Sequence, residues 1–466
     1  MAGDLINGEI PDHWEFTTLG EICQRGGGNI QTGPFGSQLH ASDYVPVGVP
    51  SIMPTNIGEN RIVEDGIVRI TEEDANRLGQ HRLRAGDIIY SRRGDVEKRA
   101  LIREREEGWF CGTGCLKVRL GIGVVDPLFA SLFLGHPAIR EWIVRHAVGA
   151  TMPNLNTTIM SAVPFALPPL AEQKAIAAVL GELDDKIELN RQINATLEAM
   201  ARALFQSWFV DFDPVRAKLD GRPPAALDPA TAALFPDSFQ DSAVGHIPHG
   251  WKVGVLDELT KFVIGGDWGA TEATDDETVS CYCIRGADIP SLQSGGVGKM
   301  PTRFLKPSSV EKRQLADGDL AIEISGGSPT QCTGRPVLAS EALLQNLGQP
   351  LVASNFCRII KLKSPALSKF VYLWLRRLYD AGELFQFETG TTGIKNFAFV
   401  IFSERYPLVL PDLRVAEAFD RAVSPFFARI QANSQESRTL ATLRDTLLPK
   451  LLSGEIQPTR NICQEQ

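Results

Sequence analysis

The residues of this chain that could do chemistry are mainly basic. Residues 82–105 hold eight lysines and arginines against four acidic residues, although the whole chain has a formal net charge of -9. Within this segment, Arg92 and Arg93 follow a predicted strand and precede a glycine. Guanidinium groups on such a turn can reach phosphates or the edge of a guanine. The segment is equally typical of a solvated basic loop, so both interpretations stay open.

The motifs of common catalytic sites are missing from the sequence. A phosphate-binding G-x-x-x-x-G-K-[ST] loop is absent, because Gly298-Lys299 is followed by Met300. The G-x-G-x-x-G, [DNS]-P-P-[FYW], G-x-S-x-G and H-E-x-x-H patterns are absent as well. The acidic pair Asp184-Asp185 is typical of solvated charges on a helix. We therefore predict no catalytic residue, while an undetected activity stays a weaker alternative.

Cysteine spacing and hydropathy restrict the chain further. Among eight cysteines, Cys111 and Cys115 are close, as are Cys281 and Cys283, but neither pair forms a CxxC motif. No partner pair follows at zinc spacing, so we predict reduced, mostly buried thiols and no metal site. Neither an apolar run long enough to cross a membrane nor a signal peptide is visible. These observations predict a cytoplasmic protein.

The elements that must position the basic residues occur twice in the sequence. Ile10–Trp14 recurs as Ile247–Trp251, and Leu19–Ile22 recurs as Leu256–Leu259 at the same offset. Further matches join Leu83–Ile88 to Leu315–Leu320, Gly149–Asn156 to Gly390–Phe397, and Pro164–Leu170 to Pro407–Leu413. A period this long is too large for a solenoid repeat. It indicates a duplication that gives two similar domains related by approximate twofold symmetry.

Each copy combines short strands with helical stretches. Asp87–Tyr90 and Cys115–Leu120 are typical of strands, Leu128–His146 has helical periodicity, and Asp-Gly and Gly-Gly pairs mark the loops. The predicted fold class is α+β, with two similar globular domains separated by a pair of long antiparallel helices. We place the domains at 1–166 and 245–410, the helices at 167–215 and 411–457, a linker at 216–244 and a tail at 458–466.

The two helical segments have the narrow apolar stripe of a coiled coil. Polar residues interrupt the stripe at Asn190, Asn194, Asn433 and Ser437. A buried asparagine in such a seam lowers stability but can fix register and partner choice. The alternative is that each helix packs only on its own domain. The predicted seam residues are Leu180, Leu183, Ile187, Leu197, Leu204, Ile430, Leu440 and Leu447.

Several of these segments together resemble one known family. Thr32–Leu39 resembles a loop of the target-recognition domains in Type I restriction-modification specificity subunits, and Gly86–Asp95 resembles that family's strand and basic turn. The strongest similarity is Pro168–Ile176, which continues through Leu183–Ile187 to Trp208–Phe212 and resembles the family's central helix. Each motif alone is loose, and their order and duplication make the resemblance specific.

The second half of the chain resembles the same family less closely. Gly265–Gly269, Gly318–Leu320 and Leu410–Leu413 follow the pattern. The sequence departs from it at Arg414-Val415, and Ser325-Gly326-Gly327 stands where the first half has a basic turn.

The resemblance implies a function without catalysis by this chain. A subunit of this kind reads a bipartite target in double-stranded DNA, one half-site per domain, and the helix pair sets the gap between half-sites. The implied partners are two methyltransferase subunits and the restriction or translocase subunits. Their cofactors are S-adenosylmethionine, ATP and Mg²⁺, and none is expected on this chain. The alternative is a coiled-coil protein-interaction scaffold that does not read DNA.

The candidate contact residues follow from charge, position and resemblance. Amides such as Gln38 and Asn154 can pair with adenine edges, and basic side chains with phosphates or guanine. Each has the competing interpretation of an ordinary polar loop residue. The DNA-contact candidates are Arg92, Arg93, Lys98, Arg99, Gln38 and Asn154 in the first half, and Arg285, Lys299, Arg303, Lys395 and Asn396 in the second.

Two groups are candidates for binding a protein partner. Phe205, Trp208 and Phe209 form an aromatic cluster with Phe212, for which core packing is the competing interpretation. Glu172 and Gln173 fall in the motif that resembles the family's central helix, where they suit a helix cap or a partner contact.

Overall fold

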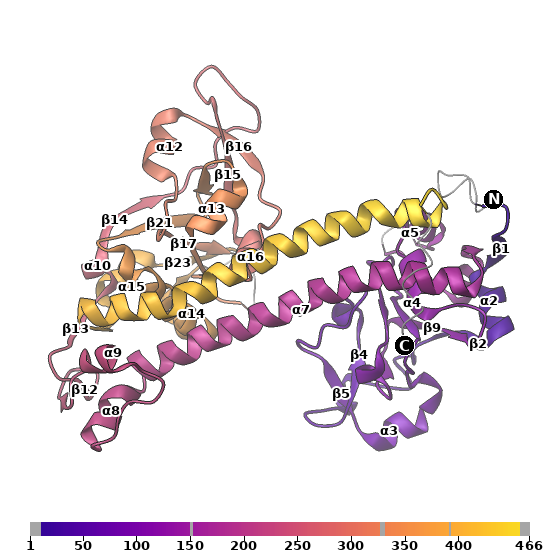
Figure 1. Ribbon diagram of the computed structural model, residues 1–466, viewed down its shortest axis with the longest axis horizontal. Helices are drawn as coiled ribbons and strands as arrows, with labels where there is room; N and C mark the ends of the chain where they lie inside the picture. The colour runs from indigo at the N-terminus through magenta and orange to yellow at the C-terminus, as the bar shows by residue number, and fades with distance from the viewer. Residues whose placement is uncertain (1–10, 150–151, 327–330, 391–392, 457–466) are drawn as a thin grey trace. The chain divides into compact units, whose positions relative to one another are not determined.

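The structure is a computed structural model that describes residues 11–149, 152–326, 331–390 and 393–456. It divides into two compact units. The first unit comprises Met1–Lys186 and Leu440–Gln466, and the second comprises Ile187–Thr439. Each unit holds one mixed α/β region and a part of each of the two longest helices (Figure 1). The tail predicted at 458–466 lies outside the described residues.

The first unit is built on two four-stranded sheets. The main sheet is antiparallel and has the order β2 (Gly27–Thr32), β9 (Cys115–Gly121), β6 (Ile88–Ser91), β7 (Arg99–Leu101). The second sheet has the order β3 (Tyr44–Val45), β5 (Val68–Ile70), β4 (Val49–Ile52), β8 (Phe110–Cys111), and its β4–β8 pair is parallel. A separate pair joins β1 (Glu15–Thr18) to β10 (Pro164–Leu167).

The second unit repeats these strand orders, except that its second sheet has no counterpart of β3. Its main sheet has the order β14 (Thr260–Gly265), β21 (Cys357–Leu362), β17 (Leu320–Glu323), β19 (Pro336–Leu338). Its second sheet has the order β16 (Thr302–Leu305), β15 (Val279–Ile284), β20 (Leu351–Ala353), and the β15–β20 pair is parallel. The pair β13 (Lys252–Gly254) and β24 (Leu408–Leu410) matches β1 and β10. The predicted duplication is therefore confirmed at the level of strand order.

Short helices with identifiable caps cover the sheets of the first unit. Thr18 and Glu21 form a capping box at α2 (Leu19–Gly26). Asp126 accepts the backbone N–H of Phe129 at the start of α4 (Pro127–Phe133), where proline suits the first helical position. The remaining short helices are α3 (Glu72–Arg77), α5 (Pro137–His146) and α6 (Thr157–Ser161). The apolar faces of α4 and α5 complete a core around Phe129, Phe133 and Phe165.

The segment 213–248 of the second unit is folded. It contains α8 (Asp213–Leu219), α9 (Pro229–Ala233) and a hairpin of β11 (Phe239–Gln240) and β12 (Ile247–Pro248). Val215 and Phe235 are buried in the core of this unit. The residues predicted as a linker, 216–244, therefore pack against the unit that follows them. Its other helices are α10 (Leu256–Leu259), α11 (Ile289–Gln293), α12 (Pro307–Arg313), α13 (Glu341–Leu347), α14 (Ser368–Asp380) and α15 (Phe399–Arg405).

The two long helices are α7 (Leu170–Phe209) and α16 (Leu413–Leu452), each of 40 residues. In the first unit, Asp184 of α7 accepts from Arg444 of α16 at 2.7 Å. In the second unit, Asn190 of α7 donates to Ser437 of α16 at 3.3 Å, and Asn194 donates to Ser434 at 3.0 Å. Later residues of α7 thus meet earlier residues of α16. The predicted antiparallel pairing is confirmed (Figure 1).

The seam between the long helices is less apolar than the sequence pattern suggests. Asn433 donates to the Oδ1 atom of Asn194 at 2.9 Å, Asn194 donates to Ser434 at 3.0 Å, and Asn190 donates to Glu436 at 2.8 Å. These asparagines are buried and largely exchange hydrogen bonds with each other and with α16. Of the predicted seam residues, Leu180 and Ile430 are buried, whereas the half-buried ones are Leu183, Ile187, Leu197, Leu204, Leu440 and Leu447.

The described cysteines are free thiols in the interior, as predicted: Cys23, Cys111, Cys115, Cys281, Cys283, Cys332 and Cys357. Burial raises the pKa of each of them. Among the described residues, no cluster of histidine, cysteine and acidic side chains could hold a metal ion. Within the same residues, no helix has the length and apolarity to span a bilayer.

Candidate nucleic-acid interface

Several loops of the first unit meet at one end of its main sheet. The strands β2 and β6 end beside the start of β9, because Thr32 pairs with Leu116 and Ser91 pairs with Cys115. The chain after each strand therefore emerges at the same end. Residue Arg93 also bridges to Asn154, which adds a third loop. We call the residues 32–38, 91–95, 112–115 and 152–155 the first loop edge.

Backbone hydrogen bonds hold the first loop edge in place. The N–H of Gly33 donates to the carbonyl of Cys115 at 2.8 Å, and the N–H of Arg92 donates to that of Gly114 at 2.8 Å. The N–H of Leu155 donates to the carbonyl of Arg92 at 2.9 Å. A Cβ atom on Gly33 would lie 2.2 Å from the carbonyl oxygen of Gly112, so only glycine permits this approach. The loops are thus fixed by main-chain contacts, which leaves their side chains available.

The side chains of the first loop edge combine positive charge, an aromatic ring and unused hydrogen-bonding atoms. Arg93 is exposed, and the guanidinium of Arg92 lies 5.7 Å from the ring centroid of Phe35, which is 57% exposed. The Nε of Arg92 and the Oδ1 of Asn154 are shielded from water without a hydrogen-bond partner. Burial, with a contribution from Arg93, lowers the pKa of Arg92. An unmet buried donor or acceptor is costly, so the first loop edge carries two polar atoms that the described residues leave unsatisfied.

Most of the other basic side chains in 82–105 are engaged inside the unit. Arg82 is paired with Glu72, and Arg103 lies 3.5 Å from Asp185. The Nε of Arg99 donates to the carbonyl of Ser131 at 2.6 Å, so this side chain points inward. Lys98 is exposed and lies 3.4 Å from the carboxylate of Asp95. The positive charge available at the edge is therefore mainly that of Arg92 and Arg93.

Gln38 is exposed but already has a local hydrogen bond. Its Oε1 atom accepts the backbone N–H of Phe35 at 3.1 Å and stabilises the turn that carries the phenyl ring. The side chain thus orients the loop, and its amide nitrogen donates to no other atom in the part of the chain that the structure describes.

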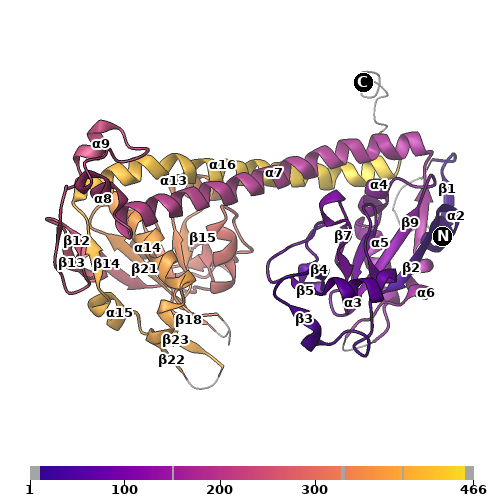
Figure 2. The ribbon, with the colours of Figure 1, turned by 90° about the horizontal axis from the view of Figure 1, so that it is seen from below.

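The second unit has an equivalent edge, formed by residues 266–269, 324–326, 354–357 and 395–397, which we call the second loop edge. The N–H of Gly266 donates to the carbonyl of Cys357 at 3.0 Å, and the N–H of Ile324 donates to that of Phe356 at 2.8 Å. The strand β18 (Ser325–Gly326) pairs with β23 (Lys395–Phe397), which pairs with β22 (Glu388–Thr389). These three strands project from the side of the unit opposite α16 (Figure 2).

The cations of the second unit are held differently. The guanidinium of Arg303 lies 3.9 Å from the ring centroid of Trp268, and its Nε is shielded without a hydrogen-bond partner. Lys395 pairs with Glu388 at 3.0 Å and lies over the ring of Phe385. Asn396 is exposed on β23. An arginine stacked on an aromatic residue is thus present in both units.

Two further candidates of the second unit lie in loops beside its second sheet, Arg285 directly after β15 and Lys299 before β16. Arg285 bonds to the carboxylate of Asp288 at 2.9 and 3.0 Å and to the carbonyl of Lys299 at 2.6 Å. This pairing fixes the guanidinium and raises the pKa of Arg285. Lys299 is exposed. Neither residue belongs to the second loop edge as defined by its hydrogen bonds.

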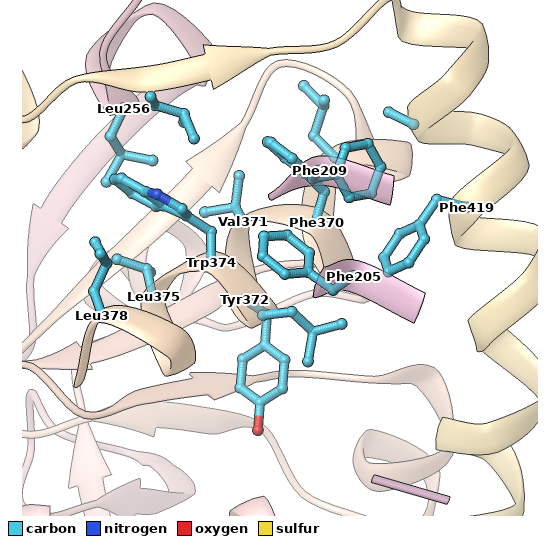
Figure 3. Packing of buried hydrophobic residues seen from close by; sticks show 14 of the residues in the cluster. Phe205, Phe209, Leu256, Phe370, Val371, Tyr372, Trp374, Leu375, Leu378 and Phe419 are labelled. Carbon is cyan, nitrogen blue, oxygen red and sulfur yellow. The ribbon is translucent and has the colours of Figure 1, made fainter. Parts of the chain in front are cut away.

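The aromatic residues suggested as a partner surface lie in the core of the second unit. Phe205, Trp208 and Phe209 are 3%, 3% and 6% exposed. The ring of Phe209 lies 4.8 Å from that of Phe370 on α14 and 4.9 Å from that of Phe419 on α16 (Figure 3). They are interior because α7, α14 and α16 converge on them. This packing corrects the docking interpretation of these three rings.

Gln173 also lies inside the protein, with 1% of its surface exposed. Its Oε1 accepts the N–H of Asp126 at 2.8 Å, and its Nε2 donates to the carbonyl of Pro168 at 2.7 Å. It therefore ties the start of α7 to the loop before α4 and offers no surface to a partner. Glu172 is half-buried and accepts from Trp14 at 3.2 Å while lying 3.0 Å from His13.

Some residues of the two edges carried no individual signal in the sequence. Thr113 has a shielded hydroxyl without a partner, and Phe356 is 54% exposed beside β21. Both precede a buried strand, where side chains are usually interpreted as packing. The glycines around Phe35 and Trp268 were the available signal, since a tight glycine-flanked turn presents its central side chain.

Three comparisons with known proteins agree. A family model described as "Type I restriction modification DNA specificity domain" matches residues 11–199. The HindI specificity subunit of a Type I restriction enzyme from Haemophilus influenzae is 24% identical over 452 residues, covering 87% of this chain and 95% of the relative. The corresponding MjaIX subunit from Methanocaldococcus jannaschii is 24% identical over 455 residues, covering 97% and 95%.

A solved structure is similar in fold along nearly the whole chain. The S subunit of a Type I restriction-modification system from M. genitalium superposes with a TM-score of 0.50 at 16% sequence identity. The match covers 94% of this chain and 96% of that chain. At this identity the likeness concerns the fold alone.

Proposed function

We propose, from the premise that the chain belongs to the family of Type I restriction-modification specificity subunits, that each of its two α/β regions reads one half of a bipartite DNA target. The chain supplies sequence specificity, and the chemical steps belong to other subunits. We assign the two target-recognition domains to residues 1–166 and 245–410. The protein-interaction scaffold without DNA readout is the less favoured alternative.

The observation that carries this proposal is the pair of loop edges. Each edge gathers loops from separate strands at one sheet end and fixes them by backbone hydrogen bonds. Each unit also holds an arginine against an aromatic ring, with an Nε atom that lacks a partner. Sequence is read by side-chain donors and acceptors on base edges, while cations position the duplex through its phosphates. The loop edges supply both kinds of group.

The partners in this proposal are those of a restriction-modification complex. We propose two methyltransferase subunits that use S-adenosylmethionine, and restriction or translocase subunits that use ATP and Mg²⁺, in the cytoplasm. Glu172, near the start of α7, stays a candidate for contacting them. We further propose that the long helices, about 60 Å each at 1.5 Å per residue, fix the spacer between the half-sites.

The test is methylation mapping of the assembled complex. The full chain would be co-expressed with the modification subunit encoded beside it, and methylated positions would be mapped across a genome of known sequence. We expect one bipartite motif with a fixed spacer. Binding of the complex to that motif should weaken steeply as salt rises, because phosphate contacts release counterions. Assembly with a protein partner but no motif, with binding that is insensitive to salt, would favour the scaffold.

A further inference from the structure

The two loop edges can be aligned residue by residue through their hydrogen bonds. The N–H of Arg92 donates to the carbonyl of the residue before Cys115, and the N–H of Ile324 donates to that of the residue before Cys357. The carbonyl of Arg92 accepts from Leu155 at 2.9 Å, and the carbonyl of Ile324 accepts from Phe397 at 2.9 Å. Arg92 and Ile324 therefore occupy the same place in the two units.

The same alignment brings two asparagines into register. Arg93 bridges to Asn154 in the first unit, and Ser325 pairs with Asn396 in the second. Asn154 and Asn396 each precede the residue that donates to the aligned carbonyl. They are thus equivalent positions, in a frame defined by main-chain contacts rather than by sequence similarity.

The residues next to Asn154 differ from those at the equivalent positions next to Asn396. The aligned pairs around them are Arg92 and Ile324, Arg93 and Ser325, Pro153 and Lys395, and Leu155 and Phe397. Of these five aligned positions, only that of Asn154 and Asn396 carries the same side chain in both units. Cys115 and Cys357, which also match in this frame, are fully buried, so packing accounts for them.

A structural role does not explain why this residue is the same in both units. No side-chain hydrogen bond joins either amide to the part of the chain that the structure describes, and Oδ1 of Asn154 is shielded without a partner. By contrast, Asn156, two residues later, caps α6 by accepting the N–H of Ile159 at 2.8 Å. Its equivalent is Ala398. The asparagine with a structural task is not retained, whereas the one without such a task is.

We propose that Asn154 and Asn396 are the matched base-reading residues of this chain, each contacting an adenine in one half-site. An asparagine amide pairs with the N6 and N7 atoms of adenine in the major groove, donating with its nitrogen and accepting with its oxygen. Equivalent positions in two similar units should contact equivalent base pairs of the two half-sites. This inference rests on the proposed function and adds to it one base identity and one residue per half-site.

The test compares Asn154→Asp and Asn396→Asp in the complex with the modification subunit. Each change keeps the side-chain size and replaces the amide donor by a carboxylate oxygen. We expect each variant to bind the wild-type target about 10- to 100-fold more weakly. A pool of duplexes randomised at one base pair at a time should show the preference abolished at one position, in a different half-site for each variant. Asn154→Ala and Asn396→Ala should abolish the same preferences.

The control is Asn156→Ala, which removes a helix cap in the same loop. It should lower thermal stability without changing base preference, which separates loop distortion from loss of a base contact. Variants that stay folded and keep every base preference, while the wild-type complex reads a bipartite motif, would overturn the inference and leave the proposed function standing. A wild-type complex without any sequence preference would overturn both.

Discussion

The first and second loop edges share a backbone frame but differ in where they place charge. The first has Arg92 and Arg93 at the end of β6, next to Ser91. At the end of β17 the second has Ile324 and Ser325, next to Glu323, whose carboxylate is paired with Arg335 at 2.8 Å. The cation of the second edge, Lys395, comes from β23 instead. The same backbone arrangement can therefore carry different charged side chains in the two units, because main-chain hydrogen bonds do not depend on the side chains.

The largest expected effect is a loss of stability that is confined to the second unit. Phe209→Ala removes a ring buried among Phe370, Phe419 and Trp251, and we expect a loss of about 3–5 kcal/mol of unfolding free energy in the second unit. Hydrogen exchange followed by mass spectrometry would resolve the two units. Met200→Ala, on the same helix at a side chain that is 46% exposed, is the control. Equal deprotection of both units would show that they do not unfold separately.

The next largest effect, on the affinity for DNA, is expected when the two arginines of the first loop edge are removed. Arg92→Ala with Arg93→Ala should weaken binding of the complex to its target by about 1–3 kcal/mol per base that the two guanidinium groups read. The slope of log affinity against log salt should fall by about 1 per phosphate that they neutralise. Titration at several salt concentrations measures both quantities. Arg145→Ala, an exposed arginine of α5 paired with Glu141, should change neither.

A smaller effect is expected when the second loop edge is given the positive charge that the first loop edge already has. Ser325→Arg places a cation at the position equivalent to Arg93, and we expect the salt slope to rise by about 1. Binding to unrelated duplexes should tighten as well, because a phosphate contact is independent of sequence. Ser325→Gln, with a long uncharged side chain, is the matched control. An unchanged slope for Ser325→Arg would show that the second edge does not approach the phosphates.

The smallest effect is a difference in acid sensitivity. Burial and the nearby Lys117 lower the pKa of His81 from 6.5 to about 4, and burial lowers the pKa of His136. Between pH 6.5 and about pH 4, His81 is protonated in the unfolded chain but neutral in the folded first unit. Its unfolding free energy should therefore fall as pH drops from 6.5 towards 4 and then level off. The second unit has only the exposed His246 and His249.

Hydrogen exchange at pH 7 and pH 5 would measure this difference. The first unit should lose protection at pH 5 relative to the second, and His81→Gln should reduce the loss. The prediction fails if the variant and the wild type respond alike.

The sequence predicts the repeating parts of this molecule well and its tertiary ion pairs poorly. The duplication, the strands around the basic turn and the two long helices follow from local patterns. The seam residues Asn190 and Asn194 were also visible as polar gaps. By contrast, the pairing of Arg103 with Asp185 joins residues from distant elements, so the basic segment 82–105 seemed more available than it is. Ion pairs of this kind depend on the fold, which the order of charges along the chain does not contain.

The same limitation applies to the partner candidates. Phe205, Trp208 and Phe209 have the spacing of one helix face, and spacing alone does not say what covers that face. Two helices that are distant in sequence, α14 and α16, cover it in the structure. The alignment of Asn154 with Asn396 shows the opposite case, since both were identified one at a time and their equivalence appears only in the hydrogen-bond pattern.

The packing of α16 has a consequence for biosynthesis. Leu448, Leu451 and Leu452 complete the core of the first unit together with Trp14 and Ile176, although the whole second unit precedes them in the chain. Domains generally fold in order as they emerge from the ribosome. Here the second unit is continuous in sequence and can close first, while the core of the first unit still lacks these three leucines. The first unit can therefore complete its core only after translation has passed residue 452.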